Sequence, residues 1–197
     1  MTVKRFIVYF RIYYACSSTG QSGGLRIRRL EVRILSGVLI DERIYMNKAE
    51  DEKWMREALK EAEKSFSNEE VPVGAVVVNK GAIIGRGCNR KEALKDPTAH
   101  AEIIAITAAA NSIGDWRLEG SILYSTLEPC LMCAGAIIQA RLSRVVYGAK
   151  DEKFGAFGSV IDVRNKGWNW EFEVVSGILK EESAALLKTF FKERRDG

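Results

Sequence analysis

The chain of 197 residues has only three prolines, four cysteines and one histidine, and it lacks a long apolar run. A membrane-spanning helix needs about 18 or more apolar residues in succession, and Arg11 interrupts the aromatic-rich stretch from Phe6 to Tyr14. Four cysteines are too few for a disulfide scaffold in a chain of this length. With 47% hydrophobic and 28% charged residues, the composition predicts a folded, soluble protein with no membrane partner.

The excess of positive over negative charge lies in the first 45 residues. The formal net charge is +4, but the first 45 residues carry eight Lys and Arg against three Asp and Glu, whereas residues 46–197 carry 22 against 23. A net positive charge is typical of proteins that bind nucleic acid. Because the main body is nearly neutral, only local clusters of basic side chains could bind RNA.

Residues 1–45 differ in composition from the rest of the chain. An aromatic stretch is followed by a Ser/Gly linker, Ser17 to Gly24, and an Arg-rich stretch, with no acidic residue before Glu31. Such a leader is typical of an organellar transit peptide, but an upstream extension of a reading frame that starts at Met46 explains it as well, and we favour the extension. We therefore expect residues 1–45 to lie outside the fold and residues 46–197 to form one domain, which is long enough to bury a core.

The main body alternates helical and strand patterns. Trp54, Met55, Ala58 and Ala62 recur at helical spacing, and the turn at 79–81 joins two β-branched runs into a hairpin. We expect helices at 54–67, 99–111, 129–140 and 181–195, and strands at 73–78, 82–88, 122–125, 145–147 and 172–175. This alternation predicts a layered α/β domain.

The single histidine, His100, precedes a Cys-x-x-Cys motif formed by Cys130 and Cys133. Thiolate sulfur and imidazole nitrogen suit zinc, and two cysteines three residues apart in the first turn of a helix lie on one side of it. Pro129 fits at or just before the start of such a helix. The pattern predicts one Zn2+ per chain, and three protein ligands leave a fourth position for water, as in catalytic zinc sites.

Two other interpretations of these residues are open. A closed structural site, in a zinc-stabilised binding module without activity, would need Cys88 or Cys16 as a fourth ligand. Cys88 ends an apolar strand, where a free cysteine usually packs as a small hydrophobic residue, and Cys16 lies in the N-terminal extension. A redox Cys-x-x-Cys is the second alternative, but it leaves His100 and its neighbour Glu102 unexplained.

Glu102 would add acid–base chemistry to the metal site. Residues two apart lie on opposite sides of an ideal helix, so His100 and Glu102 can converge only where the helix begins irregularly. The segment 96–98, Asp-Pro-Thr, supplies such an entry. A carboxylate beside a zinc-activated water can take up and return a proton. Without the metal ligands, Glu102 would be explained as an acidic residue favoured by the helix dipole.

The motif His100-Ala101-Glu102, followed by Pro129-Cys130-x-x-Cys133, resembles the signature of the zinc-dependent cytidine and adenine deaminase superfamily. Longer strings at 71–75, 96–102, 126–136 and 154–163 resemble the bacterial tRNA adenosine deaminases, and the resemblance extends from Trp54 to Arg195. It implies a three-layer α/β/α fold, similar to cytidine deaminase, with a mixed five-stranded sheet, and a cytoplasmic homodimer.

The same resemblance implies hydrolytic deamination of the wobble adenosine of a tRNA anticodon to inosine by a zinc-activated water. The tRNA anticodon stem-loop would then be the partner. A deaminase of a free base or nucleoside, of cytosine, guanine or cytidine type, is the alternative, because the zinc signature is common to both.

Residue roles follow from the matched positions. The resemblance implies that His100, Cys130 and Cys133 hold zinc, and that Glu102 is the catalytic proton carrier. Asn89 resembles a base-contacting asparagine of the family, but a turn asparagine with a left-handed backbone would explain it equally well. The remaining implied substrate-binding residues are Val71, Ala101, Leu127 and Asp151.

Basic residues near the motif and on the last helix are candidates for RNA contacts, because single-stranded RNA is bound over basic grooves. Each one taken alone is explained equally by a solvated surface. They are Arg141, Arg144, Lys150, Lys153, Lys188, Lys192, Arg194 and Arg195.

Overall fold

The computed structural model describes residues 32–35, 38–164 and 167–196. The chain divides into two units, Met1–Glu50 and Asp51–Gly197. In the described part of the first unit, β1 (Val32–Leu35) and β2 (Val38–Asp41) form an antiparallel pair. The sequence had not predicted these strands. The aromatic stretch, the Ser/Gly linker and Cys16 lie outside the described residues.

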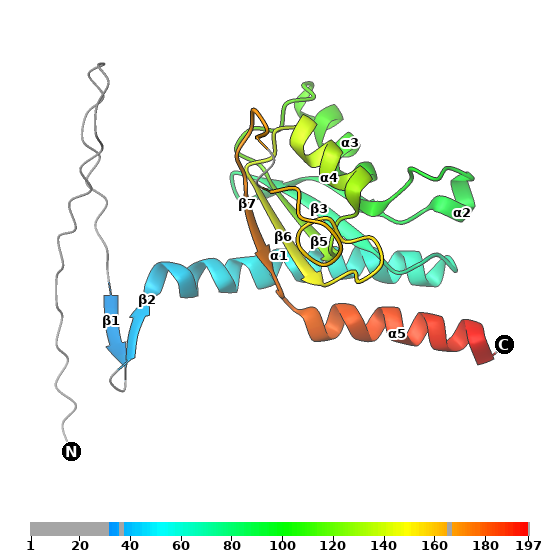
Figure 1. Ribbon diagram of the computed structural model, residues 1–197, viewed down its shortest axis with the longest axis horizontal. Helices are drawn as coiled ribbons and strands as arrows, with labels where there is room; N and C mark the ends of the chain where they lie inside the picture. The colour runs from blue at the N-terminus through cyan, green and yellow to red at the C-terminus, as the bar shows by residue number, and fades with distance from the viewer. Residues whose placement is uncertain (1–31, 36–37, 165–166, 197) are drawn as a thin grey trace. The chain divides into compact units, whose positions relative to one another are not determined.

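Five strands form the sheet of the second unit, in the order β4, β3, β5, β6, β7 (Figure 1). They are β3 (Gly74–Asn79), β4 (Ala82–Cys88), β5 (Ile122–Leu127), β6 (Arg144–Ala149) and β7 (Glu173–Ser176). The pairs of β3 with β4 and with β5 are antiparallel, whereas β5, β6 and β7 run parallel. The sheet is therefore mixed, as the family resemblance implied.

Helices cover both faces of this sheet (Figure 1). One face carries α3 (Ala101–Ile113) and α4 (Leu131–Gln139), and the other carries α1 (Glu42–Ser67) and α5 (Lys180–Asp196). The short helix α2 (Lys91–Leu94) lies in the connection between β4 and α3. This arrangement confirms the predicted three-layer α/β/α fold.

Successive side chains of a strand point to opposite faces of the sheet, so there is one apolar core under each helical layer. In β3, Ala75 and Val77 pack in the core shared with α3 and α4, whereas Val76 and Val78 pack in the core shared with α1. This is the period of two that a strand buried on both faces requires. The two cores fix the helices against the sheet.

Two glycines on β4 allow α3 to lie unusually close to that strand. A Cβ atom on Gly85 would lie 2.2 Å from the carbonyl oxygen of Ala105, and one on Gly87 would lie 2.1 Å from that of Ala101. No side chain fits at either position without moving the helix backbone. The start of α3, with Glu102 in its first turn and His100 directly before it, can therefore lie close to β4 because these two positions carry no side chain.

Some element boundaries differ from the sequence prediction. Helix α1 begins at Glu42 rather than at Trp54 and passes Met46, the predicted start of the domain. Helix α4 begins at Leu131 rather than at Pro129, and α2 was predicted as a loop. Within the described residues, no helix has the length and apolar character needed to cross a membrane.

Candidate active site

The ligand atoms of three side chains form a compact triangle. The distances are 3.7 Å from Cys130 Sγ to His100 Nδ1, 3.6 Å from Cys133 Sγ to His100 Nδ1, and 3.7 Å between the two sulfurs. A tetrahedral zinc ion with bonds of about 2.3 Å to sulfur and about 2.0 Å to nitrogen holds two sulfurs about 3.8 Å apart, and a sulfur and a nitrogen about 3.5 Å apart. The triangle therefore fits zinc, and His100, Cys130 and Cys133 are positioned to hold it.

The N-termini of two helices bring these ligands together. His100 is the residue before the first turn of α3, with an extended backbone at φ −75° and ψ 152°. Cys130 occupies the same position before α4, at φ −73° and ψ 174°. Because His100 stands outside the helix and Glu102 in its first turn, the two side chains are not forced to opposite sides of a regular helix. The irregular helix entry predicted from the sequence is present.

Mutual contacts shift the ionisation of the ligands. The Cys133 thiol, by donating a hydrogen bond, lowers the pKa of Cys130 to about 4, and the same bond together with burial raises the pKa of Cys133. The contact with Cys130 raises the pKa of His100. Zinc binds thiolates, so binding of the ion through both sulfurs requires that both cysteines be deprotonated.

Glu102 lies beside the metal triangle and is 3% exposed. Its Oε1 accepts a hydrogen bond from Ser125 Oγ at 3.3 Å, which ties the carboxyl group to strand β5. Burial raises the pKa of this carboxyl group. Ser125 was not identified from the sequence, because it is an ordinary strand residue until the fold places it opposite α3.

A cavity of about 300 Å³ opens onto this cluster. It is lined by His100, Glu102 and Cys130 together with every residue that the sequence implied for substrate binding: Val71, Asn89, Ala101, Leu127 and Asp151. Val73, Lys91, Glu128 and Phe154 complete the lining. The volume and the mixture of apolar walls with a few polar groups are typical of a small-ligand site.

Asn89 is held in place by a buried carboxylate. Its Nδ2 donates a hydrogen bond to Glu70 Oε2 at 3.3 Å, and Glu70 Oε1 accepts the N–H of Ala93 at 2.8 Å. Asn89 is not among the described residues with a positive φ, so the explanation as a left-handed turn asparagine is wrong. Glu70 was not predicted, because an acidic residue in a polar segment gives no signal of burial.

Within the part of the chain that the structure describes, no fourth protein ligand joins the three. Among the described His, Cys, Asp and Glu side chains, the group that could hold a metal consists of His100, Cys130 and Cys133, without Cys88. Cys88 is a partly buried free cysteine at the end of β4. The three-ligand arrangement leaves the side facing the cavity open.

Some of the basic candidates are engaged within the protein. Arg144 is 15% exposed and donates hydrogen bonds to Asp51 at 2.6 and 2.9 Å and to Glu173 at 3.0 Å. Six of the other candidates for RNA contacts have exposed side chains: Lys150, Lys153, Lys188, Lys192, Arg194 and Arg195.

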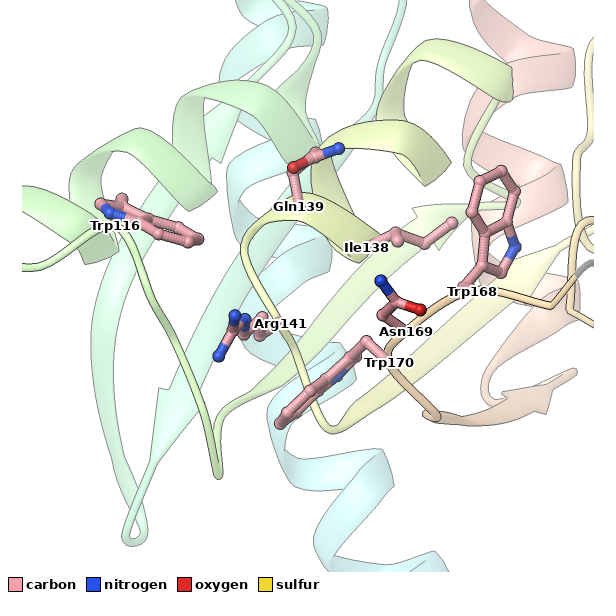
Figure 2. A pocket seen from close by; sticks show the side chains of 7 residues that line it. All are labelled: Trp116, Ile138, Gln139, Arg141, Trp168, Asn169 and Trp170. Carbon is pink, nitrogen blue, oxygen red and sulfur yellow. The ribbon is translucent and has the colours of Figure 1, made fainter.

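Arg141 borders a second cavity, of about 270 Å³, at the C-terminal end of α4. Figure 2 shows its lining, in which Trp116, Trp168 and Trp170 surround the end of the helix. The Arg141 guanidinium lies 5.7 Å from the ring centre of Trp116 and 5.8 Å from that of Trp170. It also donates a hydrogen bond to Glu119 at 2.9 Å, so its charge is balanced locally.

Residues 48–149 match the family described as the cytidine and deoxycytidylate deaminase zinc-binding region. The chain belongs to the cytidine and deoxycytidylate deaminase family. It is 47% identical over 147 residues to the tRNA-specific adenosine deaminase of Bacillus subtilis. The aligned region covers 74% of this chain and 91% of that protein.

Solved structures of this deaminase family have the same fold. A structure from a study of A-to-I editing by tRNA:A34 deaminases at the wobble position is 45% identical, with a TM-score of 0.65, over 68% of this chain and 99% of the other. A guanine deaminase from Nitrosomonas europaea is 25% identical, with a TM-score of 0.61, over 71% of this chain and 83% of the other. The protein is thus a zinc-dependent deaminase.

Proposed function

We propose that this deaminase converts the wobble adenosine of a tRNA anticodon to inosine, in the cytoplasm. The observation that supports the proposal most is the buried Glu102 carboxyl group beside the metal triangle. This group faces a cavity lined by Val71, Asn89, Leu127 and Asp151. The identity of 47% to a relative named tRNA-specific adenosine deaminase favours tRNA as the substrate.

Glu102 would move the protons of the reaction. When bound, zinc supplies a Lewis acid that activates water near neutral pH. Glu102 accepts a proton from the attacking water and delivers it to a nitrogen of the purine ring. It then takes the proton of the hydroxyl group newly formed at C6 and transfers it to the departing amine, so that C6 becomes a carbonyl carbon. A C–O bond forms at C6, the C6–N bond breaks, and ammonia leaves. The hydrogen bond from Ser125 keeps the carboxyl group oriented through this cycle.

The cavity walls would orient the base. Val71, Ala101 and Leu127 supply apolar surface against which a purine can lie. Asn89, anchored by Glu70, supplies a fixed polar group for the base edge. A site that hydrogen-bonds one base edge rejects bases that leave its polar groups unpaired.

We also propose that the protein is a homodimer that associates through the outer face of α3 and α4. Apart from the buried Glu102, neither helix carries a charged residue, and Leu131 and Gly135 are exposed on α4. Depletion of charge is typical of interface cores. Gly135→Arg, which meets open space within the chain, should change the mass in light scattering from twice 22.0 kDa to 22.0 kDa. A wild-type monomer would refute the proposal.

Residues 46–197 should suffice for this activity. Both cores, the metal triangle and the cavity are formed by residues of the second unit. A chain that starts at Met46 should therefore keep the melting temperature and activity of the full chain, and a large loss of either would show that residues 1–45 contribute to the fold.

The deciding experiment is detection of inosine by mass spectrometry in bulk tRNA incubated with the zinc-loaded protein. We expect inosine at position 34 of a tRNA and slow turnover of free adenosine. The free-base alternative is disfavoured by the lower identity, 25%, to a guanine deaminase. Comparable turnover of free cytidine or guanine with no inosine in tRNA would establish that alternative.

A further inference from the structure

Glu128 is a buried carboxylate that the reaction itself does not use. It lies two residues before the metal ligand Cys130 and is 1% exposed. A carboxylate buried this deeply is costly unless hydrogen bonds replace its water. The donors that surround it therefore indicate what it holds.

All of the observed donors come from one loop, residues 150–159. Glu128 Oε1 accepts the N–H of Phe157 at 2.9 Å and of Ser159 at 3.2 Å. Glu128 Oε2 accepts the N–H of Asp151 at 3.3 Å and a short hydrogen bond from Ser159 Oγ. One side chain thus fastens both ends of the loop, and hydrogen bonds to a charged acceptor are stronger than those to a neutral one.

Backbone contacts join the same loop to the metal-ligand segment. The N–H of Ala156 donates to the carbonyl oxygen of Pro129 at 3.0 Å, and Gly155 forms an antiparallel bridge with Cys130. A Cβ atom on Gly155 would lie 2.6 Å from the Glu128 carboxyl carbon, so only glycine permits this approach. The 150–159 loop and the segment before α4 therefore form one unit around Glu128.

The loop supplies two groups to the cavity, Asp151 and Phe154. The Phe154 side chain is 68% exposed, and Asp151 Oδ1 accepts the N–H groups of Lys153 and Phe154, at 2.9 and 3.1 Å, which shapes the turn. An exposed aromatic ring at the mouth of a cavity is a stacking surface for an unpaired base.

We propose that Glu128 is a positioning residue that fixes the 150–159 loop so that Phe154 stacks on a nucleotide next to the edited base. The proposal rests on the proposed function, because it requires a single-stranded RNA substrate. It assigns Phe154 to substrate binding and gives Glu128 a role that acts through the loop.

Glu128→Gln tests the positioning role. The amide keeps one acceptor oxygen, but its NH2 group opposes the N–H of Asp151, so part of the loop loses its anchor. We expect amide hydrogen exchange at Asp151, Phe157 and Ser159 to accelerate at least about tenfold. KM for an anticodon stem-loop should rise about tenfold while kcat changes less than about threefold, the pattern of lost binding rather than lost chemistry. Zinc should remain at one per chain.

Asp51→Asn is the matched control. Asp51 is also a buried carboxylate, but it holds Tyr124 and Arg144 in the core shared with α1, under the other helical layer. The Asp51→Asn variant should have a lower melting temperature, with unchanged KM and unchanged amide hydrogen exchange in the 150–159 loop. An equal rise of KM in Asp51→Asn would reduce Glu128 to a general structural role and overturn the proposal.

A double-mutant cycle tests the path through Phe154. Phe154→Ala should raise KM in the wild-type background and have little further effect in Glu128→Gln, because the ring is already displaced. Additive effects would overturn the proposal. If Glu128→Gln does not fold, Ser159→Ala replaces it: this variant removes one donor and should raise exchange and KM in the same direction by about threefold.

Different results would refute the proposed function and the positioning role of Glu128. A wild-type protein that makes no inosine in tRNA refutes the proposed function and with it the stacking role of Phe154. Normal editing by the wild type, with unchanged KM and exchange in the Glu128 variant, refutes the positioning role alone. Exchange is measured without RNA, so it reports on the anchor even where editing is absent.

Discussion

At the scale of single residues, Glu102 is the side chain on which turnover should depend most. Its carboxyl group is buried between the metal triangle and Ser125. Glu102→Gln keeps the shape and the hydrogen-bond acceptor but cannot cycle a proton. We expect inosine formation to fall about 100- to 10,000-fold, the usual contribution of a general acid or base, with zinc retained at one per chain.

Single-turnover assays and metal analysis check this prediction. Ser125→Ala, which removes only the hydrogen bond to Oε1, is the control and should reduce the rate far less. Activity of Glu102→Gln within a few-fold of wild type, with zinc retained, would remove Glu102 from the mechanism.

Substitutions of Cys130 and of Cys88 should have opposite effects on zinc content. Cys130→Ala removes one corner of the triangle and should abolish stoichiometric zinc, whereas Cys88→Ser should retain one zinc per chain because Cys88 is outside the metal group. Chelation of the wild type should lower the melting temperature, because the ion joins the starts of α3 and α4. Loss of zinc from Cys88→Ser would contradict the three-ligand site.

The metal ligands were predictable from the sequence because their side chains have few other uses. A lone histidine with a Cys-x-x-Cys motif restricts the chemistry strongly. Glu70 and Glu128 carried no such signal, since exposed glutamates are common and their partners are distant in sequence: Ser159 lies 31 residues after Glu128. Their burial follows from the tertiary fold alone.

At the scale of elements, the contact between β4 and α3 places the site. Gly87→Ala would force the start of α3 away from the strand, since the new Cβ would lie 2.1 Å from the Ala101 carbonyl oxygen. Overpacking of this kind typically costs about 1–3 kcal/mol. We expect a loss of that size in the free energy of unfolding, and weaker zinc retention because His100 directly precedes Ala101.

Gly85→Ala is the matched comparison. Its Cβ would lie 2.2 Å from the Ala105 carbonyl oxygen, one turn further along α3. It should cost similar stability in denaturant unfolding but disturb zinc binding less. Equal zinc loss in both variants would mean that the whole helix, rather than its first turn, is displaced.

Periodicity predicted the elements that carry a regular apolar pattern and failed where that pattern is missing. The hairpin of β3 and β4 and the helix α5 were found within about two residues of the predicted bounds, because alternating or helical apolar spacing runs through each. Helix α2 has only four residues and none is buried, so it leaves no apolar pattern. Before Trp54, α1 continues through a charged stretch that the pattern could not distinguish from a loop.

At the scale of the whole molecule, the basic end of α5 lies beside the segment that leads into the cavity. Arg194 donates a hydrogen bond to the carbonyl oxygen of Glu69, and Phe190 packs edge-on against Phe66 with ring centres 5.8 Å apart. Glu69 precedes Glu70, which holds Asn89, and Val71, which lines the cavity. The exposed Lys188, Lys192, Arg194 and Arg195 thus form a local basic cluster on a nearly neutral body.

Binding of tRNA should therefore depend on salt. Each phosphate contact with single-stranded RNA contributes a slope of about −0.7 to the logarithm of the association constant against the logarithm of salt concentration. Reversing the charge of Lys192, Arg194 and Arg195 together should weaken binding of an anticodon stem-loop and flatten this slope, while zinc content stays unchanged. Fluorescence anisotropy at several salt concentrations measures both effects, with reversal of Lys80 at the distant β3–β4 turn as the control. An unchanged slope would place the RNA away from α5.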